Sequence, residues 1–444
     1  MVPNMSNEHT SALSKDQTPI AIFWFRRDLR IEDNTALAEA LANDIPVLPI
    51  FIYDRLILNE LPEDDPRVNF IHQTILKIKE TLKSHGSDIL CLDGEPATIW
   101  KELISKFNIA GVYTNRDYEP YAIGRDKEIA QLLAKKDIPF FSFKDQVIFE
   151  KREIVKGDQD PYTVFTPYKN KWLAKFGEKN PLPLKDPKLN NLHKGDCPPL
   201  SLEDIGFKKS DIQVQDFDLT QLHLYADQRD FPYKDSTSHL SPHLRFGTIS
   251  IRQVIARIDK KYEVFLSELI WREFFMQILF HFPHVVTQNF RSKYDGIKWR
   301  NNKEEFRLWC EGKTGYPMVD AGMRQLNKTG FMHNRVRMIT AGFLCKHLLI
   351  DWRWGESYFA KKLLDYELSS NNGNWQWAAG TGCDAAPYFR IFNPQSQQKK
   401  FDKDYKYVRK WIPEFDSFEY PDPIVDHKSA RERALKAYKI GIES

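Results

Sequence analysis

Short apolar runs alternate with helix-period segments over the first third of the chain. The runs are rich in β-branched and aromatic residues and lie at 20–25, 45–53, 88–92, 110–115 and 138–143. Between them, apolar residues recur every three or four positions, as they do on one face of a helix. This alternation predicts an α/β domain whose parallel sheet carries helices on both faces.

The segment after the first apolar run lacks the glycines of a dinucleotide site. A G-x-G-x-x-G fingerprint would follow this strand in a dinucleotide-binding βαβ unit. Residues 26–34 of this chain instead read RRDLRIEDN. We therefore predict that the first domain has no standard dinucleotide site.

The periodicity fades over residues 146–215 and then returns in a different form. Prolines such as Pro181, Pro183 and Pro187 punctuate this polar stretch, which indicates a long interdomain connection. Beyond it, helix-period segments such as VFLSELIWREFFMQILFHF follow one another without a clear strand. The predicted organisation is a disordered N-terminal segment over 1–18, an α/β domain over 19–145, a linker over 146–215 and an all-helical domain over 216–444.

Composition narrows the classes of function. The formal net charge of the 444 residues is only +3, so any nucleic-acid affinity requires a local basic patch. The five cysteines are scattered without a C-x-x-C pair, which argues against a metal site and favours a reducing compartment. The polar N-terminus lacks the apolar core of a signal peptide, and no run of about 18 apolar residues predicts a membrane span. A cytoplasmic location is expected.

Tryptophans concentrate toward the C-terminus, where eight of the eleven follow residue 270. The stretch NNGNWQWAAG (371–380) holds two of them beside three asparagines. On a helix, Asn371 and Trp375 share a face, whereas the rings of Trp375 and Trp377 diverge by roughly 200°. We expect one of these tryptophans to face an interior site and the other a second wall. Packing of both rings in the core is the alternative.

A glutamate stands in the apolar helical segment SELIWREFF. Glu268 and Trp271 are three positions apart and therefore share a helix face. A carboxylate in apolar surroundings needs a partner or must be protonated. Glu268 is thus a candidate acid or hydrogen-bonding group beside an aromatic wall. The alternative is a surface glutamate paired with Arg272 one turn later.

Polar residues at helical spacing also occur in MHNRVRMITA. Asn334 and Met338 share one face of the expected helix, and Arg337 can meet a buried carboxylate such as Asp365. The hydroxyl-rich run STSHLSPHLRFG (236–247) precedes a further helix, where hydroxyl and backbone N–H groups suit phosphate binding. A core helix and an N-cap without a ligand are the alternatives. The chain has no G-x-S-x-G, H-E-x-x-H or Walker A motif.

Several motifs together resemble the photolyase/cryptochrome flavoprotein family. They include FWFRRDLRIEDNTAL, TSHLSPHLRFGTIS, GKTGYPMVDAGMRQL, MHNRVRMITAGFL and NNGNWQWAAGTGCDAAPYFRIFNP, and the similarity spans nearly the whole chain after residue 19. The resemblance implies an α/β antenna domain, a long linker and a helical domain that binds FAD. It also implies light-driven DNA repair, in which excited reduced FAD passes an electron to a flipped-out cyclobutane pyrimidine dimer.

The FAD contacts of the family fall on matching positions of this sequence. Around the phosphates, the resemblance places Tyr225, Thr237, Ser238, Leu240 and Ser241. Around the rings and the substrate side, it places Trp271, Asn334, Arg337, Asp365, Glu367 and Asn371. His239 stands where many relatives have arginine.

The resemblance also implies catalytic and electron-transfer roles. The expected dimer pocket consists of Glu268, Asn334 and Met338, walled by Trp271 and Trp377. The expected electron chain runs through Trp375, Trp352 and Trp299 toward the surface. Arg229 and Arg335 match DNA-binding positions. The expected partner is double-stranded DNA containing cyclobutane pyrimidine dimers, bound by a monomer.

Within the family, Met338 and Asn371 favour a class I cyclobutane-dimer photolyase. A blue-light receptor that signals through a protein partner is the alternative. The usual folate contacts are not matched, because Ala122 stands where folate-binding relatives have glutamate, and Val286 and Thr287 replace a Cys-Lys pair. The identity of a second antenna chromophore therefore stays open between a deazaflavin, a second flavin and none.

Overall fold

The computed structural model describes residues 18–179, 183–185, 187–258 and 261–443. The segment 1–18, predicted to be disordered, lies outside the described residues except for its last residue. The chain forms two compact units, each made from several stretches of sequence. The first contains Met1–Glu150, Lys179–Val214 and Ser241–Asp259, and the second contains Lys151–Glu178, Gln215–Leu240 and Lys260–Ser444.

The first unit is built on the parallel five-stranded sheet that the apolar runs predicted. Its strands are β1 (Ile20–Phe25), β2 (Val47–Asp54), β3 (Leu90–Gly94), β4 (Ile109–Asn115) and β5 (Phe140–Phe143). Their order is β3-β2-β1-β4-β5, and every neighbouring pair is parallel. Its helices are α1 (Thr35–Leu41), α2 (Arg55–Leu58), α3 (Pro66–Lys83), α4 (Pro96–Lys106), α5 (Pro120–Ala134), η2 (Leu189–Asn191), α8 (Ser241–Phe246) and α9 (Ile251–Ala256).

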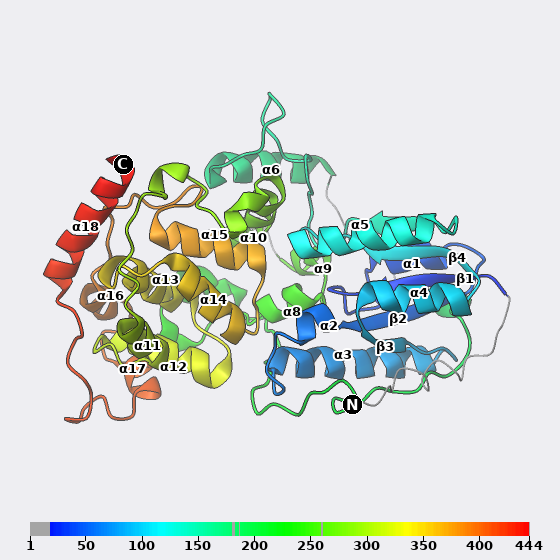
Figure 1. The fold of residues 1–444 in the computed structure, drawn as a ribbon, viewed down its shortest axis with the longest axis horizontal. Coiled ribbons are helices and arrows are strands. Elements are labelled where there is room, and N and C mark those ends of the chain that lie inside the picture. The colour runs from blue at the N-terminus through cyan, green and yellow to red at the C-terminus, as the bar shows by residue number, and fades with distance from the viewer. Residues whose placement is uncertain (1–17, 180–182, 186, 259–260, 444) are drawn as a thin grey trace. The chain divides into compact units, whose positions relative to one another are not determined.

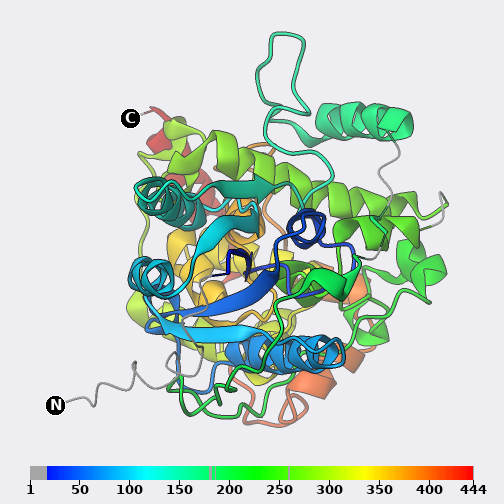
Figure 2. The ribbon, with the colours of Figure 1, turned by 90° about the vertical axis from the view of Figure 1, so that its right-hand side faces the viewer.

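Helices cover both faces of this sheet, as Figure 1 and Figure 2 show. Successive side chains of a strand point to opposite faces. Phe23 of β1 packs in a cluster with residues of α1 and α3, whereas Trp24 packs in another with residues of α4 and α5. An unbroken apolar strand therefore needs a helical layer on each side.

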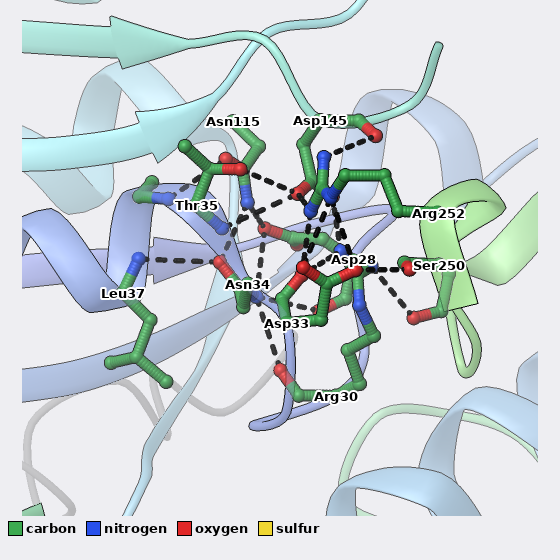
Figure 3. Close-up of polar contacts among 12 residues, drawn as sticks. Asp28, Arg30, Asp33, Asn34, Thr35, Leu37, Asn115, Asp145, Ser250 and Arg252 are labelled. Atoms are coloured by element: carbon green, nitrogen blue, oxygen red, sulfur yellow. Dashed lines mark hydrogen bonds and ion pairs between the residues drawn. The ribbon is translucent and has the colours of Figure 1, made fainter. Parts of the chain in front are cut away.

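A buried polar network lies beyond the end of β1 (Figure 3). Arg252 of α9 donates from Nε to Asp33 (3.0 Å) and from Nη2 to Asp145 (2.8 Å). Arg30 donates to the other carboxylate oxygen of Asp145 (2.5 Å). Burial raises the pKa of Asp145, but Arg30 and Arg252 outweigh this effect and hold that pKa below its ordinary value. The network binds the segment Ser241–Asp259 into the first unit.

The same network includes the end of β4 and the start of α1. Asn115 donates from Nδ2 to Asp28 (2.6 Å) and to Asn34 (2.7 Å). Asn34 in turn caps α1 by accepting from the backbone N–H of Leu37 (3.2 Å). A dinucleotide in a doubly wound sheet binds at such strand ends. Here the protein's own polar side chains pair with one another at that place (Figure 3).

The described residues of the second unit form helices, connecting loops and an isolated β-bridge between Val155 and Pro161. Its longer helices are α6 (Phe165–Lys179, of which Lys179 falls in the first unit), α7 (Leu222–Gln228), α10 (Glu263–His281), α11 (Lys303–Glu311), α12 (Pro317–Thr329), α13 (Asn334–Gly342), α14 (Trp352–Lys362), α15 (Leu368–Ala379), α16 (Pro394–Phe401), α17 (Lys406–Trp411) and α18 (His427–Glu443). Its short turns are η3 (Pro232–Lys234), η4 (Pro283–Val286), η5 (Ser292–Tyr294) and the π-helical η6 (Phe343–His347). No helix in the described part of the chain is long and apolar enough to cross a membrane.

The stretch predicted as a linker is divided between the two units. Its part Lys151–Glu178 belongs to the second unit and contains most of α6. Trp172 of α6 donates from Nε1 to Glu273 of α10 (2.7 Å), and the Tyr168 hydroxyl donates to the same carboxylate (3.3 Å). Since these partners lie far apart in the sequence, local periodicity gave no sign of their pairing.

A neutral histidine caps α13. Burial lowers the pKa of His333 to about 4, and its Nδ1 accepts a hydrogen bond from the backbone N–H of Arg335 (3.2 Å). Only the unprotonated Nδ1 can accept this bond. The start of the helix that carries Asn334 and Met338 therefore depends on an uncharged imidazole.

We predict that this cap weakens the protein in acid. Between pH 6.5 and about 4 the unfolded chain binds a proton that folded His333 does not, so the free energy of unfolding falls as the pH drops through this window. His333→Asn, which keeps a capping side chain, should remove this part of the acid loss, and His333→Ala should cost about 1 kcal/mol at neutral pH. Urea unfolding at several pH values measures both effects. If the free energy of unfolding fell equally with pH in wild type and His333→Asn, the prediction would be contradicted.

Candidate functional site

The loop that follows η3 contains buried hydroxyl groups without a protein partner. Ser236 Oγ and Thr237 Oγ1 are both buried, and neither forms a hydrogen bond within the described part of the chain. A buried hydroxyl is costly unless it is hydrogen-bonded. These two groups therefore fit a ligand with acceptor oxygens, such as the phosphates of FAD. Thr237 was predicted to contact the phosphates, whereas Ser236, its neighbour in the same run, was not.

The remaining residues predicted around the phosphates lie in different surroundings. Ser238 accepts at its carbonyl oxygen from the N–H of Asp218 (2.9 Å), and Leu240 is buried. Tyr225 of α7 packs its ring edge-on against Phe265. Ser241 begins α8 and belongs to the first unit, whereas the other four belong to the second.

Glu268 of α10 pairs with Arg229, not with Arg272. The distance from Arg229 Nη1 to Glu268 Oε1 is 2.6 Å, and Arg272 instead lies 3.6 Å from Glu367. The side chain of Glu268 is 35% exposed, so the fully apolar surroundings expected from the segment are absent. A predicted pocket residue and a predicted DNA-binding residue thus neutralise each other in this structure.

Arg335, the second predicted DNA-binding residue, also has partners within the protein. Arg335 Nη2 donates to Asp230 (2.7 Å), and the guanidinium lies over the ring of Phe401, 4.4 Å from its centroid. On the same helix, Asn334 is exposed and Met338 is half-buried. The helical spacing expected for Asn334 and Met338 is confirmed by α13.

The ion pair predicted between Arg337 and Asp365 is confirmed. Arg337 Nη2 donates to both carboxylate oxygens of Asp365 (2.9 and 3.2 Å), and its Nε donates to the carbonyl of Met332 (2.7 Å). A two-oxygen contact of this kind fixes orientation as well as distance. It ties α13 to the segment that leads into α15.

Two of the three asparagines in NNGNWQWAAG point inward. Asn371 donates from Nδ2 to Glu356 Oε1 of α14 (2.8 Å), and Asn372 donates to the carbonyl of Val285 (2.9 Å). Asn374 is exposed. Burial raises the pKa of Glu356, which the bond from Asn371 opposes. Glu356 was not predicted as a site residue, because its position in DWRWGESYF does not reveal which amide it contacts.

The tryptophans of α15 face different surroundings, as their spacing predicted. Trp375 is buried and meets Phe359 edge-on, whereas Trp377 is half-buried. The ring of Trp375 lies so close to α14 that a Cβ at Gly355 would approach it to 2.1 Å. Glycine at position 355 therefore makes room for this indole.

The other two tryptophans of the predicted electron chain adjoin the same core. Trp352 is buried in one cluster with Trp375, and its Nε1 donates to Asn289 (2.9 Å). Trp299 is half-buried and packs against this cluster. Trp309, which the sequence analysis did not select, meets Trp375 edge-on with a centroid distance of 6.1 Å.

Trp271 lies between two phenylalanine rings. It stacks on Phe165 of α6 with a centroid distance of 3.6 Å and packs against Phe275 of α10 at 5.4 Å. Phe165 falls in the predicted linker, so sequence periodicity offered no signal for this contact. Among the described residues, no group of three or more histidine, cysteine or acidic side chains is arranged to hold a metal ion.

Comparison with known proteins covers nearly the whole chain. Residues 21–188 match the family described as DNA photolyase, and residues 265–419 match the FAD binding domain of DNA photolyase. Proteins named deoxyribodipyrimidine photo-lyase from Halobacterium salinarum and Escherichia coli are each 36% identical, over 94% of this chain and 98% of their own length.

Solved structures agree in fold. A class III photolyase from Agrobacterium tumefaciens has a TM-score of 0.85 at 36% identity, covering 98% of this chain and all of its own. An archaeal photolyase from Sulfolobus tokodaii, described with two FAD molecules, has a TM-score of 0.78 at 34% identity, over 94% of this chain and 99% of its own. A cryptochrome from Synechocystis has a TM-score of 0.84 at 25% identity, and the match covers 96% of this chain and 100% of the cryptochrome chain. This chain belongs to the DNA photolyase family, and its helical unit contains the FAD-binding domain of that family.

Proposed function

We propose that this protein splits cyclobutane pyrimidine dimers in DNA in a light-driven reaction. Its full-length relatives named deoxyribodipyrimidine photo-lyase support light-driven DNA repair. The observation that carries the finer proposal is the buried amide of Asn371, held by Glu356 (2.8 Å). An uncharged amide at this position suits a fully reduced flavin, whereas plant-type cryptochromes have aspartate there.

The protein's part in binding FAD rests on groups of the second unit. The hydroxyls of Ser236 and Thr237 would donate to its phosphate oxygens, and Asn371 would contact its ring system. The Arg337–Asp365 pair would fix the helices around it. Bound reduced FAD supplies the photoexcited electron for repair.

The Arg229–Glu268 pair supports a coupled exchange when damaged DNA binds. A DNA phosphate is a strong acceptor for an arginine guanidinium, so it can draw Arg229 away from Glu268. The carboxyl group of Glu268 then becomes available to hydrogen-bond the flipped-out dimer. Asn334 and Met338 would complete the pocket, with Trp271 and Trp377 as walls.

The burial of three tryptophans supports an inward electron relay. Trp375 and Trp352 are at most 2% exposed, and Trp299 is half-buried. Electrons would therefore enter at Trp299 and pass inward through Trp352 and Trp375. The relay restores the reduced cofactor and takes no part in splitting the dimer.

A second chromophore is consistent with the family. The Sulfolobus tokodaii photolyase is described with two FAD molecules, which are said to imply a novel light-harvesting cofactor. We propose that the first unit of this chain serves an antenna, whose chemical identity stays open.

A blue-light receptor is the second candidate function, favoured by the structural likeness to the Synechocystis cryptochrome. Repair of a thymine-dimer oligonucleotide by the reduced protein under blue light, with a dark control, separates the two. Light-dependent recovery of thymines supports the repair enzyme. No recovery by a protein that binds FAD and is photoreduced would overturn the proposal in favour of a receptor.

We predict that Glu268→Ala lowers the quantum yield of repair severalfold while FAD stays bound. The dimer loses a hydrogen bond to a charged group, which contributes about 1.5–3 kcal/mol. Single-flash repair of the dimer oligonucleotide measures the yield, and flavin absorbance measures occupancy. Glu304→Ala, an exposed position of α11, is the matched control. A Glu268→Ala yield equal to that of the control would rule out this role.

We predict that Trp299→Phe blocks photoreduction of oxidised FAD but spares repair by the chemically reduced protein. Phenylalanine keeps the packing but is much harder to oxidise than tryptophan, so electron entry stops. Flavin absorbance under continuous blue light measures photoreduction. Trp411→Phe, which lies outside the proposed relay, is the control. Normal photoreduction in Trp299→Phe would disprove the relay.

We predict that Arg335→Ala reduces the salt dependence of DNA binding. One fewer phosphate contact lowers the slope of log affinity against log salt by roughly 0.9. Asp230→Asn should strengthen binding, because Asp230 competes with phosphate for Arg335. Fluorescence anisotropy at several salt concentrations measures the slope, with the exposed Arg409→Ala as control. A wild-type slope in Arg335→Ala would exclude the contact.

A further inference from the structure

A groove of about 370 Å³ lies between α18 and the segment after η5. It is lined by Gly296, Lys298, Arg433, Lys436, Ala437 and Ile440. Its floor is apolar and its rim has three cationic side chains. The residues predicted for FAD, the dimer or DNA do not line it.

The two lysines at the rim of this cationic groove have no ion-pair partner among the described residues. Lys298 and Lys436 are both exposed. Arg433 donates from Nη2 to the carbonyl of His347 (2.6 Å), while its buried Nε has no partner among the described residues. The nearby Arg300 is already paired with Glu305 (2.7 Å). An apolar floor with unpaired cations at its rim fits a small organic anion.

The groove adjoins the outer tryptophan of the proposed relay. Trp299 follows Lys298 in the chain, and the Trp299 indole packs against the same small cluster as Ala437. The cluster contains Tyr438, whose ring meets Trp299 edge-on with a centroid distance of 5.8 Å. A molecule in the groove would therefore lie next to the place where electrons enter.

The neighbouring tyrosine is poorly suited to fill an electron hole on Trp299. Oxidation of a tyrosine becomes favourable only when its proton can leave, but the Tyr438 hydroxyl donates to the carbonyl of Ala379 (2.7 Å), which is not a base. The Lys346 amino group donates to the same carbonyl (2.7 Å) and lies 3.6 Å from the Tyr438 ring centroid. When charged, it opposes a second positive charge there. Tyr438 therefore leaves room for an electron donor from solution.

We propose that the cationic groove binds a small organic anion that donates one electron to Trp299. This inference rests on the proposed relay and adds the class of its external reductant. The anion loses one electron, and the Trp299 radical cation gains it and returns to neutral indole. A proton released by the oxidised donor passes to water. Lys298, Lys436 and Arg433 raise the local concentration of the anion next to Trp299.

The test follows the tryptophan radical in the full-length protein with oxidised FAD bound. A laser flash creates the radical, and transient absorption records its decay at increasing concentrations of ascorbate, an anionic donor, or of hydroquinone, a neutral one. Burial lowers the pKa of Lys346 to about 7. The pH is therefore kept below this value, so that Lys346 is charged. The variant is Lys298→Glu combined with Lys436→Glu. The control is Lys328→Glu combined with Lys361→Glu, which makes the same change in net charge at two exposed positions outside the groove.

In the groove variant, the second-order rate constant with ascorbate should fall roughly tenfold at low salt, and the difference should vanish at high salt. The control variant should keep the wild-type constant, and hydroquinone should react equally with all three proteins. Equal ascorbate constants in the groove and control variants would overturn the proposal while leaving the relay intact. A flash that produces no tryptophan radical would overturn the relay, and the proposal with it.

Discussion

The helical unit depends on the ion pair between Arg337 and Asp365. Arg337 is on α13, and Asp365 precedes α15, so this pair connects two helices that together carry seven of the predicted site residues. Removing one member would leave a largely buried charge without its partner, which costs far more than the intact pair contributes. The hydrogen bond from Asn371 to Glu356 then joins α15 to α14. These two contacts thereby connect α13, α14 and α15.

In the first unit, too, polar contacts between distant segments hold the structure together. Its polar groups at the strand ends pair with one another, as in the contacts of Arg252 with Asp33 and Asp145. These bonds fasten the segment after residue 240 to the sheet. In the second unit, by contrast, the hydroxyls of Ser236 and Thr237 form no hydrogen bond with any residue that the structure describes. Paired groups of this kind add rigidity, whereas a buried hydroxyl without a protein partner leaves a place where a ligand oxygen can bind.

The two arginines proposed to bind DNA are held by internal partners. Arg229 pairs with Glu268, and Arg335 pairs with Asp230. In the proposed function, such pairs keep the side chains in place until a DNA phosphate replaces the carboxylate as the partner of the arginine. Binding of DNA and release of the Glu268 carboxyl group would then be one event.

The sequence by itself determined the elements and the family. Apolar runs and helical periodicity are local patterns, so the five strands, α13 and α15 could be predicted, and long motifs carried the resemblance. Tertiary structure alone decided which charges meet. Glu268 pairs with Arg229, although Arg272 is nearer in the sequence. Asn371 donates to Glu356, and Phe165 of the expected linker stacks on Trp271. Spacing along a helix fixes the direction of a side chain, but its partner depends on how distant segments pack, and no local pattern contains that information.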